Sequence, residues 1–156
     1  MKKFNLTDLL IFVFSAELVG AFSALLSGGY SDFYAELTRP PLSPPSTVFP
    51  VVWTILYALM GISVYLVWRE DTQASRQAIG IYVIQLTINF SWSIIFFRFE
   101  ALLAAAIVAV LLLAAVAVMI YSFYGVNRKA AYLHLPYLAW SLFAAYLAGG
   151  IYLLNR

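Results

Sequence analysis

The sequence contains no cysteine and a single histidine, and only 10% of its residues are charged. Without cysteine the chain forms no disulfide, thiolate nucleophile or Cys-ligated metal site. One histidine excludes a His-rich metal site. A soluble domain is usually about 25% charged, so the scarcity of charge argues against a soluble fold. The net charge of +2 is too small and too dispersed to indicate nucleic-acid binding.

Catalytic signatures are also missing. The sequence shows no Ser/His/Asp set, no pair of intramembrane carboxylates, and no glycine-rich loop of the kind that holds phosphate. We therefore assign no firm catalytic residue and expect no metal site and no obligatory cofactor.

The sequence consists mainly of long apolar stretches, and 64% of its residues are hydrophobic. A helix needs about 20 apolar residues to cross a bilayer, and five such runs occur. Backbone polar groups in lipid must be hydrogen-bonded internally. We therefore predict an all-α membrane protein, a single five-transmembrane-helix bundle. The predicted helices cover about residues 5–26, 49–68, 78–97, 101–123 and 132–154.

The basic residues between these runs predict the orientation. Six lie on one side of the membrane and three on the other if the five helices alternate in direction: Lys2, Lys3, Arg69, Arg76, Arg128 and Lys129 against Arg39, Arg98 and Arg156. The positive-inside rule places the richer side in the cytoplasm. The N-terminus is then cytoplasmic and the C-terminus outside. The first run would also fit a secretory signal, but its continuation to Leu26 favours a helix.

A proline-rich loop, residues 27–48, separates the first two predicted helices. Five of the six prolines fall between Arg39 and Trp53. Prolines fix φ and favour extended backbone, so the loop would lose little entropy on docking over the bundle as a lid. Within the loop, a short helix capped by Ser31 or Asp32 could precede the prolines. The alternative is a stiff spacer that only starts the second helix. The candidate lid residues are Phe33, Arg39, Pro40, Pro44 and Pro45.

Polar and aromatic side chains repeat at helical spacing in the third and second predicted helices. The third helix carries Tyr82, Gln85, Asn89, Trp92 and Phe96 at intervals of three and four, so they share one face. The second carries Trp53, Tyr57, Gly61, Tyr65 and Trp68, the last of which fits an interfacial anchor. Polar groups within a span usually face the bundle interior or a cavity. Hydrogen bonding between helices and a ligand cavity both explain these faces.

Three further features of the sequence concern a carboxyl group, the single histidine and a row of alanines. Glu17 lies in the middle of the first helix, where an ionisable group is a functional candidate by default, although a neutral carboxyl in a helix contact is the simpler explanation. His134 begins the fifth helix and is predicted to be interfacial. Ala101, Ala105 and Ala109 form a row of small residues that permits close helix approach, and we interpret it as a dimer interface candidate.

Several motifs, in order along nearly the whole chain, resemble the translocator protein family, also called tryptophan-rich sensory proteins: FYAELTRPPLSPP, FPVVWTILYALMGISVYLVW, QLTINFSWSIIFF and PYLAWSLFAAYL. The resemblance implies a five-helix bundle, commonly dimeric, whose first loop closes over a porphyrin-binding pocket. It also implies that Tyr34, Trp53, Asn89 and Trp140 line that pocket. The chain departs from the family pattern where Phe33 replaces a tryptophan, Leu42 an aromatic residue and Ala148 an asparagine.

The resemblance and the polar faces together predict a membrane-embedded tetrapyrrole-binding protein, a sensor or carrier in tetrapyrrole handling and stress response, in a bacterial cell membrane. Protoporphyrin IX or haem would be the ligand and a second copy of the chain the partner. Light-dependent porphyrin breakdown is one alternative, and transport of porphyrin or sterol-like ligands is another. The expected ligand-binding residues are Tyr34, Trp53, Tyr57, Gln85, Asn89, Trp92 and Trp140, with Trp53 and Trp140 reactive if the function is photochemical.

Overall fold

The computed structural model describes residues 1–28 and 32–156, and the described chain is largely helical. The elements in order are α1 (Leu6–Ser27), α2 (Asp32–Glu36), α3 (Val48–Glu70), α4 (Gln73–Ser93), a π-helical turn η1 (Ile94–Arg98), α5 (Leu102–Val126), α6 (Arg128–Leu133) and α7 (Leu135–Leu154). Ser31, one candidate cap of the short helix, lies outside the described residues.

Five helical segments of the described chain are long and apolar enough to cross a membrane: Leu6–Ser27, Val48–Glu70, Gln73–Arg98, Leu102–Val126 and Arg128–Leu154. These segments confirm the predicted five-helix membrane fold. The third and fifth predicted helices each consist of two pieces, because α4 continues into η1 and because α6 and α7 meet at His134.

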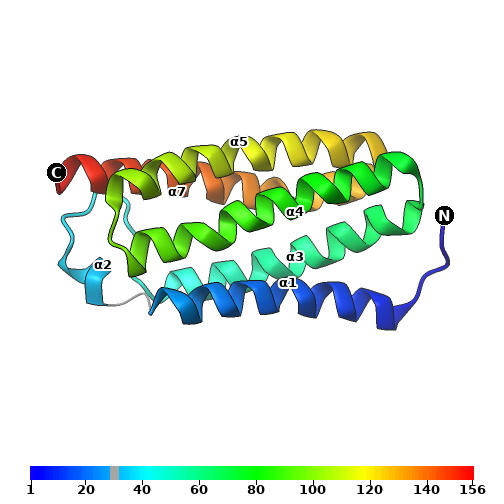
Figure 1. Cartoon of the computed structure of the whole chain (residues 1–156), viewed down its shortest axis with the longest axis horizontal. Helices are drawn as coiled ribbons and strands as arrows, with labels where there is room; N and C mark the ends of the chain where they lie inside the picture. Colours follow the sequence, from blue (N-terminus) through cyan, green and yellow to red (C-terminus); the bar gives the residue numbers. More distant parts are fainter. Residues whose placement is uncertain (29–31) are drawn as a thin grey trace.

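The long helices lie side by side as an elongated bundle (Figure 1). α1 packs mainly on α3, whereas α5 packs on both α4 and α7. The N-terminus lies at one end of the bundle, and the C-terminus and α2 lie at the other (Figure 1). The chain segment that joins α2 to α3, residues 37–47, is called the proline segment below. It therefore covers the end opposite the N-terminus.

Local sequence signals define several helix ends. The Asn5 side chain accepts a hydrogen bond from the Thr7 N–H and caps α1. Thr72 and Ser75 form a reciprocal capping box at the start of α4. Such caps satisfy backbone N–H groups that have no partner inside the helix. Asn127 caps α6 in the same way by accepting from the Ala130 N–H.

A glycine sets the close approach of α1 to α3. A Cβ atom built on Gly61 would lie 2.5 Å from Val13 Cα and 2.8 Å from the Phe12 carbonyl oxygen. Any side chain at Gly61 would therefore force the two helix backbones apart. At the N-terminal end the same pair of helices is joined by hydrogen bonds, since the Asn5 N–H donates to the Tyr65 hydroxyl at 2.8 Å and that hydroxyl donates to the Asn5 carbonyl at 3.0 Å.

The row of alanines on α5 does not face outward as predicted. Ala105 and Ala109 are buried within the single chain, with relative exposures of 0% and 2%. Both lie inside the bundle, and the indole N–H of Trp92 on α4 donates to the Ala105 carbonyl oxygen at 3.1 Å. The interpretation of Ala101, Ala105 and Ala109 as a dimer interface is therefore wrong for Ala105 and Ala109, because their small side chains allow α4 to approach α5. The dimer itself stays a prediction.

The expected position of His134 is also wrong. Its side chain is fully buried rather than interfacial, and its ring makes edge or tilted contacts with Phe123 at 5.4 Å and Tyr137 at 6.2 Å. The reason is that the last helical segment begins at Arg128, not near Tyr132. His134 consequently lies inside the bundle at the junction of α6 and α7.

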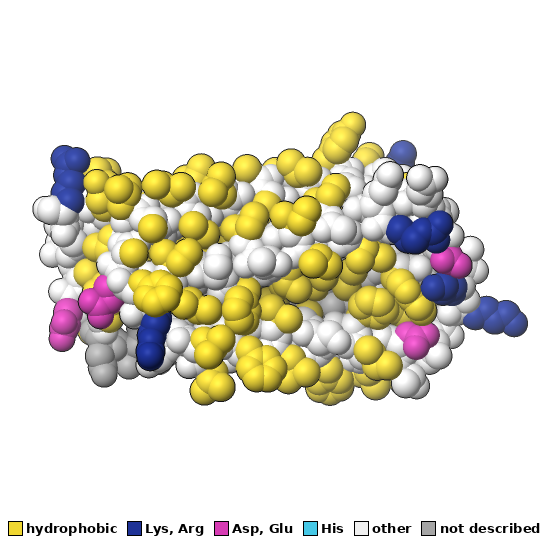
Figure 2. Space-filling view, viewed as in Figure 1, with side chains coloured by type: hydrophobic (Ala, Val, Ile, Leu, Met, Phe, Trp, Pro, Cys, Tyr) yellow, Lys and Arg dark blue, Asp and Glu magenta, His cyan; other side chains and the backbone are white. Residues whose placement is uncertain are grey.

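The surface is typical of a protein that spans a membrane. Figure 2 shows apolar side chains over the middle of the bundle and charged side chains gathered toward its two ends. Large apolar residues such as Phe14, Phe22 and Leu111 are more than half exposed. Such a band would be unfavourable in water and is expected in contact with lipid.

Candidate functional site

The predicted face of α4 points into the bundle. Its five members, Tyr82, Gln85, Asn89, Trp92 and Phe96, are all buried, the last of them in η1. The two amides make hydrogen bonds to other helices: the Tyr137 hydroxyl donates to Gln85 Oε1 at 2.9 Å, and Asn89 Nδ2 donates to the Tyr57 hydroxyl at 3.2 Å. Hydrogen bonding between helices, one of the two explanations of this face, is therefore realised.

Some polar atoms in the same interior have no partner. Among the described residues, Gln85 Nε2, Trp140 Nε1 and Ser141 Oγ are buried without a hydrogen bond, as are both ring nitrogens of His134. Buried polar groups are normally paired. Gln85 and Trp140 therefore each keep a donor that a bound acceptor could use.

A cluster of aromatic rings, called the ring cluster below, lies beneath the proline segment. Its members come from α2, α3, α4, η1 and α7: Tyr34, Phe49, Trp92, Phe96 and Trp140. Phe49 contacts Tyr34 edge-on at 5.3 Å and Trp140 edge-on at 6.0 Å between ring centroids. Trp92 stacks on Phe96 at 5.3 Å. The cavity between these rings measures only about 20 Å³, and its lining is completed by Phe97, Ala144, Leu147, Ala148 and Ile151.

The first half of the proline segment is fastened to α7 and to Asn155, the residue that follows α7. Asn155 pairs with the Thr38 backbone through two hydrogen bonds, 2.9 Å to the N–H and 2.8 Å to the carbonyl. The Tyr146 hydroxyl donates to the Pro41 carbonyl at 2.9 Å. Between these contacts Pro40 is buried, and it lies so close to Gly150 that a Cβ built on Gly150 would be 2.8 Å from Pro40 Cγ.

The short helix α2 ties the segment to the ring cluster. Tyr34 is buried, and its hydroxyl donates to the Pro44 carbonyl at 3.2 Å, while the Arg39 guanidinium lies over the Tyr34 ring at 5.1 Å. Phe33 contacts Phe96 edge-on at 5.9 Å. The proline segment is thus an ordered cover over the end of the bundle. It contacts Tyr34 of the ring cluster and the C-terminal end of α7.

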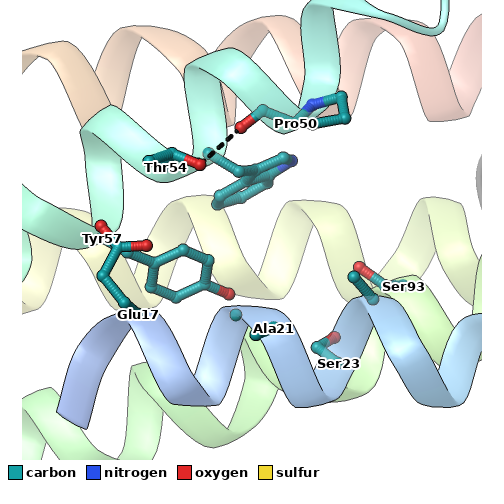
Figure 3. A pocket seen from close by; sticks show the side chains of 10 residues that line it. Glu17, Ala21, Ser23, Pro50, Thr54, Tyr57 and Ser93 are labelled. Carbon is teal, nitrogen blue, oxygen red and sulfur yellow. Dashed lines mark hydrogen bonds between the residues drawn. The ribbon is translucent and has the colours of Figure 1, made fainter. Parts of the chain in front are cut away.

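A second and larger cavity lies between α1 and α3. It measures about 140 Å³ and opens partly toward the surface. Figure 3 shows Glu17 and Ser23 on α1, Pro50, Thr54 and Tyr57 on α3, and Ser93 at the end of α4 around it. Trp53 also lines this cavity, called the α1–α3 cleft below.

The predicted ligand-binding residues are therefore divided among three places. Tyr34, Trp92 and Trp140 meet in the ring cluster. Trp53 and Tyr57 line the α1–α3 cleft, and Trp53 also contacts Tyr137 edge-on at 6.1 Å in the interior. Gln85 and Asn89 are engaged with tyrosines of other helices. Phe49 and Asn155 were not among the residues predicted from the sequence. Phe49 lies four residues before Trp53 on the same helical face, a spacing that could have identified it.

Metal binding finds no support in the described part of the chain. It holds no group of three or more His, Asp or Glu side chains placed to bind a metal ion.

Comparison with known proteins agrees with the architecture. A sequence model of the TspO/MBR family matches residues 10–154. The chain is 36% identical to the tryptophan-rich protein TspO of Archaeoglobus fulgidus over 149 residues, covering 89% of this chain and 97% of the relative. It is 36% identical to the translocator protein of Homo sapiens, covering 85% of this chain and 81% of the relative. It is 33% identical to the tryptophan-rich sensory protein of Cereibacter sphaeroides, covering 70% and 68%.

Proposed function

The chain belongs to the TspO/MBR family of membrane proteins, and we propose that it binds a tetrapyrrole within the bundle, as a sensor or carrier of that ligand. The relatives named above are called sensory and translocator proteins. Protoporphyrin IX or haem is the ligand class that we propose. The proline segment acts as the lid of the site.

The observation that supports this proposal is the ring cluster under an ordered cover. Flat π-systems gain from stacking and edge contacts with aromatic rings, and the cluster offers five rings from five elements. The unpartnered N–H group of Trp140, which lines the cavity of the ring cluster, provides a donor for the carboxylates or ring nitrogens of a tetrapyrrole. Few of the surrounding groups are charged, which suits an apolar macrocycle.

The small volume of the cavity implies that the site opens before it binds. A space of about 20 Å³ has room for about one water molecule, far less than a tetrapyrrole needs. Binding therefore requires the proline segment to lift and the rings of Tyr34, Phe49 and Trp140 to separate. We assign the described arrangement to the closed conformation of the proposed site.

A titration of protoporphyrin IX into the protein in lipid nanodiscs tests the proposal. We expect saturable quenching of tryptophan fluorescence and a shift of the porphyrin absorbance band. Trp140→Phe keeps most of the apolar bulk and removes the free N–H, so the affinity should fall by less than about tenfold, or 1.4 kcal/mol. Trp68→Phe is the matched control, because Trp68 lies near the opposite end of the bundle, with Lys2 over its ring.

Two results would contradict the proposal. One is the absence of saturable binding. The other is an equal loss of affinity in Trp140→Phe and Trp68→Phe, which would mean that the porphyrin partitions into lipid and meets tryptophans without a specific site.

A further inference from the structure

The α1–α3 cleft carries a carboxyl group that the protein itself does not pair. Glu17 lies in the middle of α1 (Leu6–Ser27) and lines the cleft. Among the described residues, its carboxyl has neither an ion-pair nor a hydrogen-bond partner. A carboxylate at this depth is costly unless it is paired or protonated. The cleft therefore contains an acceptor that lacks a donor.

The surroundings of Glu17 offer no counter-charge. The lining of the cleft includes no Lys, Arg or His. The lysines and arginines lie in the segments at the two ends of the bundle. A positive charge for Glu17 must come from a proton or from a ligand.

Most other polar groups that line the cleft already have partners. Thr54 Oγ1 donates to the Pro50 carbonyl at 2.9 Å, which Figure 3 draws as a dashed line, and Ser23 Oγ donates to the Phe90 carbonyl at 2.9 Å. The Tyr57 hydroxyl accepts from Asn89 Nδ2. Glu17 is thus the charged residue in the lining of the cleft, and it lies at the opposite end of the cleft from Ser93 (Figure 3).

The aromatic wall beside Glu17 fits a cation. Trp53 and Tyr57 lie with ring centroids 5.7 Å apart and planes inclined at 35°, and both line the cleft. Trp and Tyr faces attract ammonium groups through the ring quadrupole, more strongly when water is excluded. A carboxylate next to two such rings is a combination that favours a protonated amine over an alcohol or an acid.

The size of the cleft limits what it holds. Its volume of about 140 Å³ is close to that of an apolar cavity of about 150 Å³ that accepts a benzene ring. A small aryl or alkyl amine head would fit, and any longer tail would extend into the lipid along the open side. The α1 side of the cleft also presents small apolar residues, Gly20, Ala21 and Ala24.

From these observations we propose that the α1–α3 cleft is a separate binding site for a lipophilic amine that enters from the membrane. Glu17 pairs with the ammonium group, and Trp53 and Tyr57 cover the cation and the first part of its apolar body. This site goes beyond the tetrapyrrole site, because the cleft and the cavity of the ring cluster share no lining residue.

The experiment measures binding of 4-phenylbutylamine to the protein in nanodiscs of zwitterionic phosphatidylcholine. The readout is the rise of the melting temperature with ligand concentration, which reports binding to the folded state. The neutral analogue 4-phenylbutanol, with the same ring and chain, measures non-specific partition. Glu17→Gln removes the charge at nearly constant shape, and Ala21→Leu narrows the cleft without touching the carboxyl. Asp8→Asn is the matched control, because Asp8 is an acidic residue in the first turn of the same helix and does not line the cleft.

We expect saturable stabilisation by the amine, and an affinity lower by at least about tenfold in Glu17→Gln because the charge-assisted contact is lost. Ala21→Leu should also weaken amine binding, whereas Asp8→Asn should bind as the parent does. All variants should keep the parent's affinity for protoporphyrin IX, which shows that they are folded and that the two sites are separate. Equal stabilisation by amine and alcohol, or an unchanged amine affinity in Glu17→Gln, would overturn the proposal.

Discussion

Tyr137 donates its hydroxyl hydrogen to Gln85 Oε1 at 2.9 Å, and both side chains are almost completely buried. This bond links α7 to α4 deep within the bundle. The other end of the same amide, Gln85 Nε2, has no partner within the described part of the chain. The pair therefore combines a strong helix-to-helix contact with an unused donor in an apolar interior.

Removing one member of the pair should cost nearly as much stability as removing both. Tyr137→Phe leaves the Gln85 amide without any partner, and we expect it to lower the free energy of unfolding by about 1–2 kcal/mol. Gln85→Met removes the amide, and adding it to Tyr137→Phe should cause little further loss. A double-mutant cycle of unfolding in mixed micelles measures this coupling. Strictly additive effects would show that the bond contributes nothing.

Close packing of α1 on α3 gives a second prediction about stability. Gly61→Ala places a Cβ 2.5 Å from Val13 Cα, so the helices must separate, at a cost of about 1–3 kcal/mol. Gly80→Ala is the matched control, because a Cβ at Gly80 on α4 meets no atom within 4 Å. The control should be neutral or slightly stabilising, since alanine favours a helix over glycine. The free energy of unfolding of the two variants checks this, and equal values would mean that the contact at Gly61 is not limiting.

The sequence could predict the number of helices and the inward face of α4, because both follow from local rules. Apolar length identifies a span, and two amides at helical spacing mark the side that avoids lipid. The α5 helix shows the limit of this reasoning. Its residues from Leu102 to Ile120 are all apolar and do not distinguish its faces, so the small size of Ala105 and Ala109 fits either a second copy or the interior. Only the position of Trp92 decides between them.

The assembly of the candidate site could not be predicted for a similar reason. The rotation and height of each helix depend on packing contacts such as that of Gly61 with Val13, which leave no periodic signal. Trp53 and Trp140 were expected to line a single pocket, but Trp53 lines the α1–α3 cleft and Trp140 the cavity of the ring cluster. His134 was misplaced because the cap that starts its helix, Asn127, lies several residues before the apolar run.

The charge distribution predicts the orientation in the membrane. Leu42 in the proline segment is 84% exposed, and Ala74 at the opposite end, near the start of α4, is also exposed. If the N-terminus is cytoplasmic, Leu42→Cys should react with a membrane-impermeant maleimide in intact cells, and Ala74→Cys should react only after permeabilisation. The chain has no native cysteine, so the labelling has no background from the protein itself. The reverse pattern would invert the orientation.

Two adjacent glycines test whether the proline segment acts as a lid. Gly150→Ala places a Cβ 2.8 Å from Pro40 Cγ, whereas Gly149→Ala meets no atom within 4 Å. We expect Gly150→Ala to displace the segment, to speed amide hydrogen exchange in residues 38–43 and to raise the dissociation rate of protoporphyrin IX. Affinity changes of this kind reside mostly in the off-rate. Gly149→Ala should match the parent in both measurements. Faster exchange without faster dissociation would show that the segment moves but does not hold the ligand.

The final prediction separates simple binding from light-dependent porphyrin breakdown. An excited porphyrin can take an electron from a nearby indole, with dioxygen as the final oxidant, and indole is the most easily oxidised ring in the cluster. Trp140 lies in the ring cluster, whereas Trp53 lines the α1–α3 cleft and Trp68 lies near the N-terminal end, under Lys2. If breakdown occurs, Trp140→Phe should reduce its rate far more than it reduces affinity, Trp53→Phe should have a smaller effect, and Trp68→Phe should have none. Porphyrin absorbance followed under illumination and in the dark, at equal porphyrin occupancy, measures these rates. Breakdown at the parent rate in all three variants would mean that the indoles of Trp53, Trp68 and Trp140 take no part in it.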